Sequence, residues 1–367
     1  MNQKQFWTTL GVVVLACSLA AAQRITTFEA PGAGTGAGQG TFAQGINAFG
    51  ITWGYYIDGS GVAHGFIHTF YGGYITVNAP GAGTGSGQGT FAYSINPAGT
   101  LVGYYTDSNG AFHGYLRTLW GTITTFDAPG AGTGAGQGTY GYNINPEGTI
   151  AGFFWDSNGV AHAYLRSPNG HFTIINVAGA GTGAGQGTGT AEDIALNPEG
   201  TLTGAYIDSN SVLHAYVRAA DGTITTFNAP GAGTGAGQGT DVDGVNVAGL
   251  IPGLSMDSNN SYHGFVRAPD GTITEFDVPG AGTGSGQGTV PEGLNAEGAI
   301  IGSYIDANTV WHGFLRYRNG TYAEFDAPGA GTGANQGTFP LLNNLEDAIS
   351  GYDVDGNGVA HGFVRTP

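Results

Sequence analysis

The sequence predicts an all-β fold: a seven-bladed β-propeller of four-stranded antiparallel blades. Three observations predict it. A repeat of about 49 residues occurs seven times, each copy holds four strand-like stretches, and the two ends of the chain are offset by one strand. Tandem four-stranded units that bury little surface alone are typical of propeller blades, which stack around a channel to share a core.

A glycine-rich run and a histidine mark each copy. The run Pro-Gly-Ala-Gly-Thr-Gly begins at Pro31, Pro80, Pro129, Pro230, Pro279 and Pro328, and Ala178 takes the place of the proline in the fourth copy. The histidines are His64, His113, His162, His214, His263, His312 and His361. The fourth copy carries three extra residues between Thr188 and Asn197.

The second copy shows the predicted strands and turns. The strands are Thr90–Asn96, Leu101–Thr106, His113–Thr118 and Ile123–Asp127. They are separated by a type I-like Asn-Pro-Ala-Gly turn, by an Asp-Ser-Asn-Gly turn and, in most copies, by an Asn-Gly or Asp-Gly hairpin turn. Proline and glycine interrupt the chain too often for a helix after residue 22.

The chain ends predict how the ring closes. Ile25–Glu29 reads as a fourth strand without its blade, and the last copy stops after a third strand, His361–Arg365. Pairing the two segments closes the ring and hides two open edges. A linear β-solenoid or several small sheets are the alternatives. Strand order places the glycine-rich links and the Asp-x-x-Gly turns on one rim, and the Asn-Pro-x-Gly and Asn-Gly turns on the other.

Residues 1–22 read as a signal peptide, and residues 23–367 as a single domain. Lys4 precedes the apolar core Leu10–Leu19, and three alanines provide a cleavage site near Gln23. The protein is therefore expected to be secreted, or held at the cell surface or in the periplasm of a bacterium. Cys17, the only cysteine, leaves a lipid anchor open as an alternative to ordinary cleavage.

The charge and composition of the chain exclude some classes of binding partner. The formal net charge is −17 and Lys4 is the only lysine, so nucleic acid and anionic membranes are poor partners. The apolar leader segment is too short for a confident membrane span, and no span is expected after its removal. No cofactor is predicted, because the glycine-rich runs lack the following helix and the lysine of nucleotide-binding loops. The oligomeric state stays open.

The repeat carries the pattern Tyr-x-Asp-x-x-Gly-x-x-His-Gly-Phe-x-Arg. In the second copy it runs from Tyr105 to Arg117, with Tyr115 in place of the phenylalanine. This pattern resembles the "HAF" family of bacterial extracellular repeats, although a glycine stands where that motif has its central alanine. The resemblance covers nearly all of the chain after the leader. It implies an exported protein with a propeller-like repeat, and it implies no established activity.

Each copy also holds an aspartate six residues before its histidine. The pairs are Asp58/His64, Asp107/His113, Asp156/His162, Asp208/His214, Asp257/His263, Asp306/His312 and Asp355/His361. Because an enzyme needs one site and these pairs occur seven times, we expect them to be structural. The arginines four residues after most of these histidines are expected to form ion pairs between blades, with anion binding as the alternative. Asp353 and Asp355 resemble the start of a calcium loop, but the closing acid is missing, so no metal is predicted.

The copies differ most on the inner strand, which lines the channel of a propeller. One variable position reads Gln44, Tyr93, Tyr142, Asp243, Glu292 and Leu341, with Glu192 or Asp193 near it in the fourth copy. Together with Asp241, the acids would form an arc opposite the two tyrosines. The ligand-binding candidates are therefore Gln44, Tyr93, Tyr142, Glu192, Asp193, Asp241, Asp243 and Glu292.

These features favour an exported, non-catalytic module for binding or for a surface scaffold. The expected ligand is a carbohydrate or a small cationic molecule, bound through aromatic faces and carboxylates. A propeller glycoside hydrolase or lyase that uses the channel acids is the first alternative, since it would need two carboxylates in one pocket. A purely structural cell-envelope protein is the second. No residue is predicted to be catalytic.

Overall fold

The computed structural model describes residues 24–189 and 194–367, in which every regular element is a β-strand. After β1 (Arg24–Phe28), the first three copies form β2 (Gly40–Ile46), β3 (Thr52–Ile57), β4 (Ala63–His68), β5 (Tyr74–Val77), β6 (Gly89–Ile95), β7 (Leu101–Thr106), β8 (Phe112–Arg117), β9 (Ile123–Phe126), β10 (Gly138–Ile144), β11 (Ile150–Trp155), β12 (Ala161–Arg166) and β13 (Phe172–Ile175). The predicted leader, residues 1–22, lies outside the described residues.

The later copies form the other half of the ring. Their strands are β14 (Gly187–Thr188), β15 (Ala195–Leu196), β16 (Leu202–Ile207), β17 (Leu213–Arg218), β18 (Ile224–Phe227), β19 (Gly239–Val242), β20 (Ile251–Met256), β21 (Tyr262–Arg267), β22 (Ile273–Phe276), β23 (Gly288–Leu294), β24 (Ile300–Ile305), β25 (Trp311–Arg316), β26 (Tyr322–Phe325), β27 (Gly337–Asn343), β28 (Ile349–Val354) and β29 (Ala360–Thr366).

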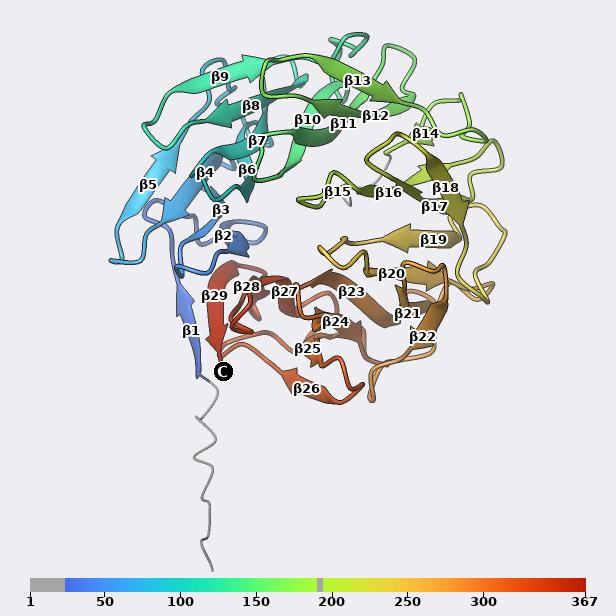
Figure 1. Ribbon diagram of the computed structural model, residues 1–367. Coiled ribbons are helices and arrows are strands. Elements are labelled where there is room, and N and C mark those ends of the chain that lie inside the picture. The colour runs from blue at the N-terminus through green and yellow to red at the C-terminus, as the bar shows by residue number, and fades with distance from the viewer. Residues whose placement is uncertain (1–23, 190–193) are drawn as a thin grey trace, which may run out of the picture.

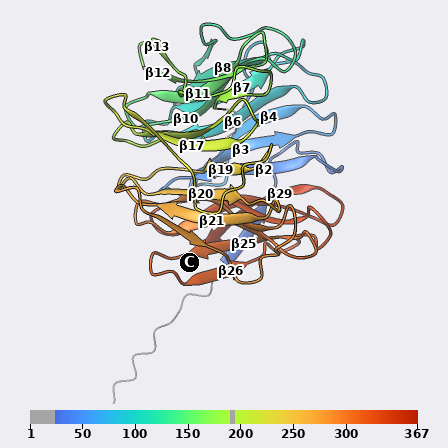
Figure 2. The ribbon, with the colours of Figure 1, turned by 90° about the vertical axis from the view of Figure 1, so that its right-hand side faces the viewer.

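The strands form a closed ring of antiparallel sheets around a central channel (Figure 1). Turned by 90°, the ring is seen from its edge (Figure 2). In the second copy β6 pairs with β7, β7 with β8 and β8 with β9, all antiparallel. The strands begin and end within one residue of the predicted bounds, because turn residues and alternating apolar residues mark them in the sequence.

The two ends of the chain close the ring as predicted. β1 pairs antiparallel with β29, in a register that sets Ile25 opposite Arg365 and Phe28 opposite Gly362. The last sheet therefore takes its outer strand from the start of the chain, and its β29 edge is covered. A row of sheets with free ends, as in a linear solenoid, is excluded by this pairing.

Neighbouring sheets are linked through the glycine that begins each inner strand. Gly40 pairs in parallel with Ala360 of the preceding sheet, and Gly89 pairs in the same way with Ala63. Gly40 has a φ of 115°, and a Cβ there would lie 2.0 Å from the Ala360 carbonyl oxygen. Only glycine fits this approach, which explains the glycine in all seven copies. A bridge between Ala33 and Asp58 places the glycine-rich link beside the Asp-x-x-Gly turn, on one rim, as predicted.

The histidines lie between two oxygen-bearing side chains. His64 Nε2 is 3.3 Å from Asp58 Oδ2, and His64 Nδ1 is 2.8 Å from Asn78 Oδ1. The other copies repeat both contacts, with Nε2–Oδ2 distances up to 3.8 Å. The Nδ1 partners, which the sequence left unassigned, are Asn78, Asp127, Asn176, Asn228, Asp277, Asp326 and Glu29. The second partner always directly follows the outer strand, so each histidine joins the end of the outer strand to the turn.

The aspartate of each pair also holds its own turn. The backbone amides of Val62 and Ser60 donate to Asp58 Oδ1. The bond from the Val62 amide lowers the pKa of Asp58, and burial opposes it less strongly. These contacts fit the structural role expected for the pairs.

The arginines do not form the expected ion pairs. Every ion pair among residues 24–189 and 194–367 has a histidine as its cation. Instead, the Arg166 guanidinium lies 4.7 Å from the centroid of the Phe126 ring of the preceding copy, and Arg267 lies at the same distance over Phe227. Arg166, Arg267, Arg316 and Arg365 thus join neighbouring sheets through cation–π contacts, since each covers an aromatic ring of the preceding outer strand.

Candidate functional site

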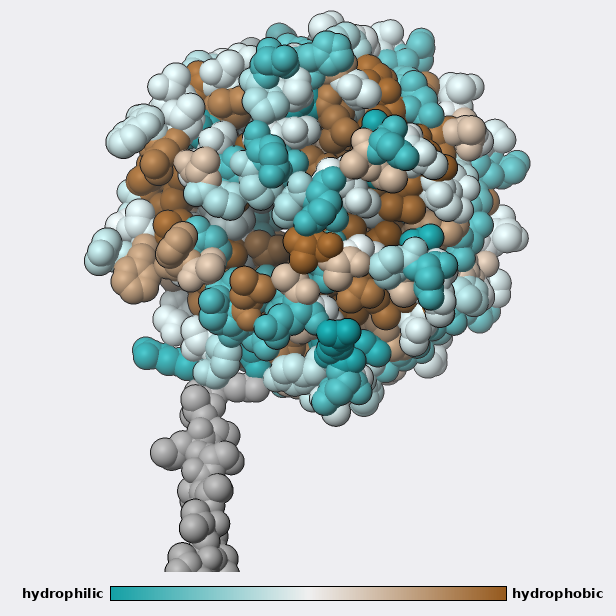
Figure 3. Space-filling model, in the orientation of Figure 1, coloured by the Kyte–Doolittle hydropathy of each residue, from teal (hydrophilic) through white to brown (hydrophobic). Residues whose placement is uncertain are grey.

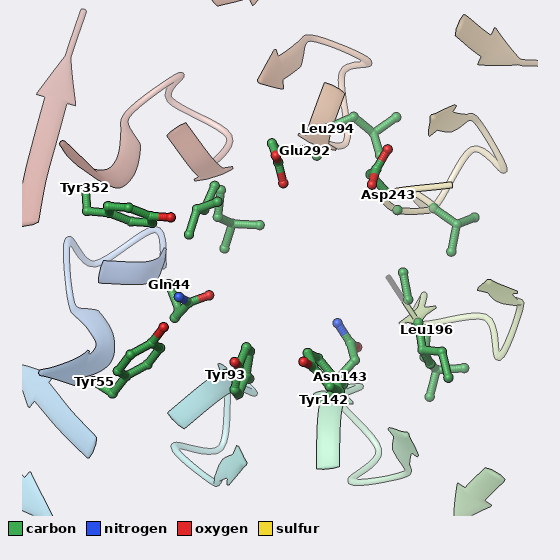
Figure 4. A pocket seen from close by; sticks show the side chains of 17 residues that line it. Gln44, Tyr55, Tyr93, Tyr142, Asn143, Leu196, Asp243, Glu292, Leu294 and Tyr352 are labelled. Carbon is green, nitrogen blue, oxygen red and sulfur yellow. The ribbon is translucent and has the colours of Figure 1, made fainter. Parts of the chain in front are cut away.

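A cavity of about 450 Å³ lies in the central channel. Six residues at the variable position of the inner strands line it: Gln44, Tyr93, Tyr142, Asp243, Glu292 and Leu341. Figure 4 shows that the tyrosines and Gln44 lie on one side and the two acids on the other. The structure therefore brings together five of the eight predicted ligand-binding residues in one cavity.

Of the other three candidates, one is not part of the cavity lining and two lie outside the described residues. Asp241 is on β19 but is not among the residues that line the cavity, and its Oδ1 accepts a hydrogen bond from the Val242 amide. It lies two residues before Asp243, at the repeat position where the first three copies carry Phe42, Phe91 and Tyr140. Glu192 and Asp193 lie outside the described residues. They belong to the insertion that separates β14 from β15 in the fourth copy.

Tyrosines form one wall of the cavity. The rings of Tyr93 and Tyr142 have centroids 4.5 Å apart, and Tyr55 lies 6.4 Å from Tyr93. Tyr55 and Tyr352 come from second strands, β3 and β28, and were not predicted. Their positions could have been found from cross-strand alternation, since Tyr55 is the direct partner of Phe42 and therefore faces the same side of the sheet.

The same asymmetry continues along the channel. Phe42 stacks on Tyr55 at 5.0 Å, Phe91 on Tyr104 at 4.8 Å, and Tyr140 on Phe153 at 4.6 Å. The seventh copy adds Phe339 against Tyr352 at 4.9 Å. The fourth, fifth and sixth copies carry Gly189, Asp241 and Val290 at the position of Phe42. The channel therefore has an aromatic half and a half without rings.

Carboxylates and aliphatic side chains form the opposite wall. Glu292 is on β23, and Asp243 follows the end of β19, so the two acids come from neighbouring copies. Leu196 and Leu294 lie on the same side of the cavity as the acids (Figure 4), and Leu341 also lines the cavity. An apolar surround strengthens hydrogen bonds and charge interactions with a bound group, because it excludes water from them.

The cavity can hold one small molecule with an apolar face and several donors. The tyrosine rings offer flat faces, and Gln44 and Asn143 offer both donors and acceptors. Within the described part of the chain, no group of three or more His, Cys, Asp or Glu side chains is placed to hold a metal ion. Asp353 is buried, and Asp355 accepts hydrogen bonds from the amides of Asn357 and Val359.

The described residues contain no helix that is long and apolar enough to span a membrane.

Comparison with known proteins shows the fold. No family model and no curated protein matches the chain. The BP39L lectin from Burkholderia pseudomallei has a similar structure, with a TM-score of 0.58 and 12% identity over 89% of this chain and 98% of the lectin. A prolyl endopeptidase matches with a TM-score of 0.52 and 10% identity, over 94% of this chain and 50% of that enzyme. At such identities the likeness concerns the fold, and this all-β ring is accordingly a β-propeller.

Proposed function

We propose that this protein is an exported, non-catalytic binding module whose central cavity binds a small carbohydrate. One observation carries the proposal: a cavity of about 450 Å³ has tyrosines on one wall and two carboxylates on the other. Sugars present C–H faces that pack on aromatic rings and hydroxyls that donate to carboxylates. The lectin of similar fold adds no weight, because a fold hosts many functions and the argument has to rest on the site.

We further propose that the propeller has seven blades. The pairings group the strands in fours, and β1 serves as the outer strand of the last group. The strand count of 29 is compatible with seven blades because the inner strand of the fourth copy is interrupted and counts twice, as β14 and β15. The "HAF"-like repeat and the signal peptide at residues 1–22 support export to the cell surface, the periplasm or the medium.

Calorimetric titration of the chain from residue 23 with mono- and oligosaccharides tests the proposal. We expect the double variant Asp243→Asn/Glu292→Gln to lose at least about tenfold in affinity, since each lost charge-assisted hydrogen bond is worth about 1.5–3 kcal/mol. A matched control, Glu199→Gln/Asp221→Asn, removes the same charge from exposed turns and should bind like the wild type.

Two results would contradict the proposal. Equal affinity in the double variant and the wild type would remove the cavity as the binding site. Release of a shortened glycan during the titration, abolished by the double variant, would instead favour a glycoside hydrolase or lyase that uses the same two acids.

A further inference from the structure

One sector of the rim opposite the glycine-rich links exposes large hydrophobic side chains. Phe49 is 73% exposed, Phe70 71%, Tyr71 94%, Leu119 59% and Trp120 89%. All five lie in turns of the first two copies: Phe49 between β2 and β3, Phe70 and Tyr71 between β4 and β5, and Leu119 and Trp120 between β8 and β9. We call these five residues the aromatic rim patch. Hydrophobic side chains are visible over the part of the ring formed by β4 and β5 (Figure 3).

The same turns of the later copies expose fewer large hydrophobic side chains, namely Val247 and Leu345. At the two positions of Phe70 and Tyr71, the third to sixth copies have Pro-Asn, Ala-Asp, Pro-Asp and Arg-Asn. Acids occur in the rim turns of every copy from the third to the seventh: Glu147, Glu199, Asp221, Asp270, Glu297, Glu346 and Asp347. The turns of the first two copies contain none. The patch is therefore both the most apolar and the least charged sector of this rim.

Packing within the turns involves Phe70 and Leu119 but leaves most of both side chains exposed. Phe70 lies against Gly50, where a Cβ would be 3.6 Å from its Cδ2, and Leu119 lies close to Gly99 in the same way. Tyr71 and Trp120 lie beyond them, nearly fully exposed. Aromatic rings at the tips of turns are suited to the interface between a lipid bilayer and water, because the lipid needs no complementary pocket to surround them.

The first described strand, β1, begins on the same rim. β1 runs antiparallel to β29, and its first residue, Arg24, pairs with Thr366 at the end of that strand, so β1 starts on the rim of the Asn-Gly turns. The apolar segment Leu10–Leu19 of the predicted leader comes shortly before Arg24 in the sequence. A membrane that holds this segment, during export or through an anchor at Cys17, would therefore face this rim.

We propose that the aromatic rim patch docks onto a phospholipid bilayer with uncharged, zwitterionic headgroups. Trp, Tyr, Phe and Leu favour the interfacial region of bilayers, where their rings are partly buried and their polar atoms stay wet. The net charge of −17 repels anionic lipids, so the attraction comes from burial of apolar surface. This inference is independent of the cavity and of its ligand.

Flotation with phosphatidylcholine vesicles tests the docking. The chain from residue 23 includes every strand of the ring, so it carries the patch without the leader. We expect it to float with the vesicles, and the double variant Tyr71→Ser/Trp120→Ser to partition on the order of tenfold less. The control Asn169→Ser/Asn319→Ser changes the equivalent turn position in two other copies and should partition like the wild type.

A second measurement reports on Trp120 itself. Its fluorescence should shift to shorter wavelength on addition of vesicles, and the shift should vanish in Trp120→Ser while thermal unfolding stays unchanged. Equal partitioning of the Tyr71→Ser/Trp120→Ser variant, or no binding of the wild type, would overturn the proposal. So would a concentration-dependent dimer that the double variant abolishes in the absence of vesicle binding, because the patch would then bind a second copy of this chain.

Discussion

The sheet that closes the ring differs from the sheets made of continuous chain. In five continuous copies an aromatic ring lies opposite the histidine: Tyr56, Tyr105, Phe154, Tyr206 and Tyr304. Tyr105 and His113, for example, stack with centroids 4.9 Å apart. In the closing sheet Asp353 lies opposite His361, and Glu29 from the far end of the chain bonds to the same histidine.

This difference places an ionisable group where five of the six continuous sheets have a ring; the remaining one has Ser255 opposite His263. Asp353 is fully buried, and neither of its carboxylate oxygens has a hydrogen-bond partner among the described residues. Burial, helped by the negative charges of Glu29 and Asp355, raises the pKa of Asp353 to about 7. We therefore expect the stability of the closing sheet to depend on pH through Asp353. In the five continuous copies that carry a ring, an uncharged aromatic side chain stacks on the histidine instead.

Removal of β1 should have the largest effect on this comparison. A chain that begins at residue 30 leaves the edge of β29 open, and we expect it to lose on the order of 5 kcal/mol of unfolding free energy, at about 1 kcal/mol for each lost backbone hydrogen bond. Chemical denaturation of this chain beside the chain from residue 23 measures the loss. A midpoint and slope identical to those of the longer chain would mean that the ends do not stabilise the ring.

The pH dependence of Asp353 comes next in size. Because its folded pKa lies above its unfolded value of about 4, the unfolded state loses its proton first as pH rises, and stability falls between about pH 4 and pH 7. His361 acts in the same direction. Burial alone would lower the pKa of His361, but Glu29 raises it overall, so its contribution is also lost as pH rises.

Asp353→Asn should remove most of this dependence. We expect the variant to be about 2–4 kcal/mol more stable than the wild type at pH 8 and nearly equal to it at pH 4, as measured by urea denaturation. Asp221→Asn, on an exposed turn, is the matched control and should follow the wild type at both pH values. A constant difference between Asp353→Asn and the wild type across this range would show that the Asp353 charge is not the cause.

The smallest expected change in unfolding free energy concerns two arginines, one in the closing sheet and one in a continuous sheet. Arg365, in the closing sheet, is 1% exposed and lies 4.9 Å from the Phe325 centroid, whereas Arg267 lies 4.7 Å from that of Phe227 and is less buried. Replacing the flat guanidinium by an ammonium should cost about 0.5–1 kcal/mol for Arg267→Lys and about 2 kcal/mol for Arg365→Lys. Thermal unfolding of the two variants measures this order, and a reversed order would contradict it.

Part of the candidate site could be predicted from the sequence. The variable position on the inner strand could be recognised because the repeat aligns it in every copy, and Asp243 and Glu292 lie in the cavity as the alignment implied. Tyr55 and Tyr352 were missed because they belong to second strands, which reach the cavity only through their pairing with inner strands. Asp241 was predicted to bind the ligand, but it lies two residues before the position that lines the cavity.

The partners of the charged side chains could not be predicted in the same way. The sequence places Asp58 and His64 near each other across one turn, but the second partner of His64, Asn78, directly follows the outer strand β5. Arg267 meets a ring of the preceding copy rather than a carboxylate, a choice that depends on how two sheets pack.

By itself, the sequence determined the local structure and the ring. Turn residues and strand alternation act over a few positions, and a period of about 49 residues forces identical units to stack, so the offset of β1 from β29 can be read along the chain. Only the tertiary structure showed which side chains of the second strands, such as Tyr55 and Tyr352, reach the cavity and which partners the charged side chains take. The aromatic wall, the acidic wall and the buried Asp353 arise from side chains far apart in sequence, whose contacts depend on the packing of whole sheets.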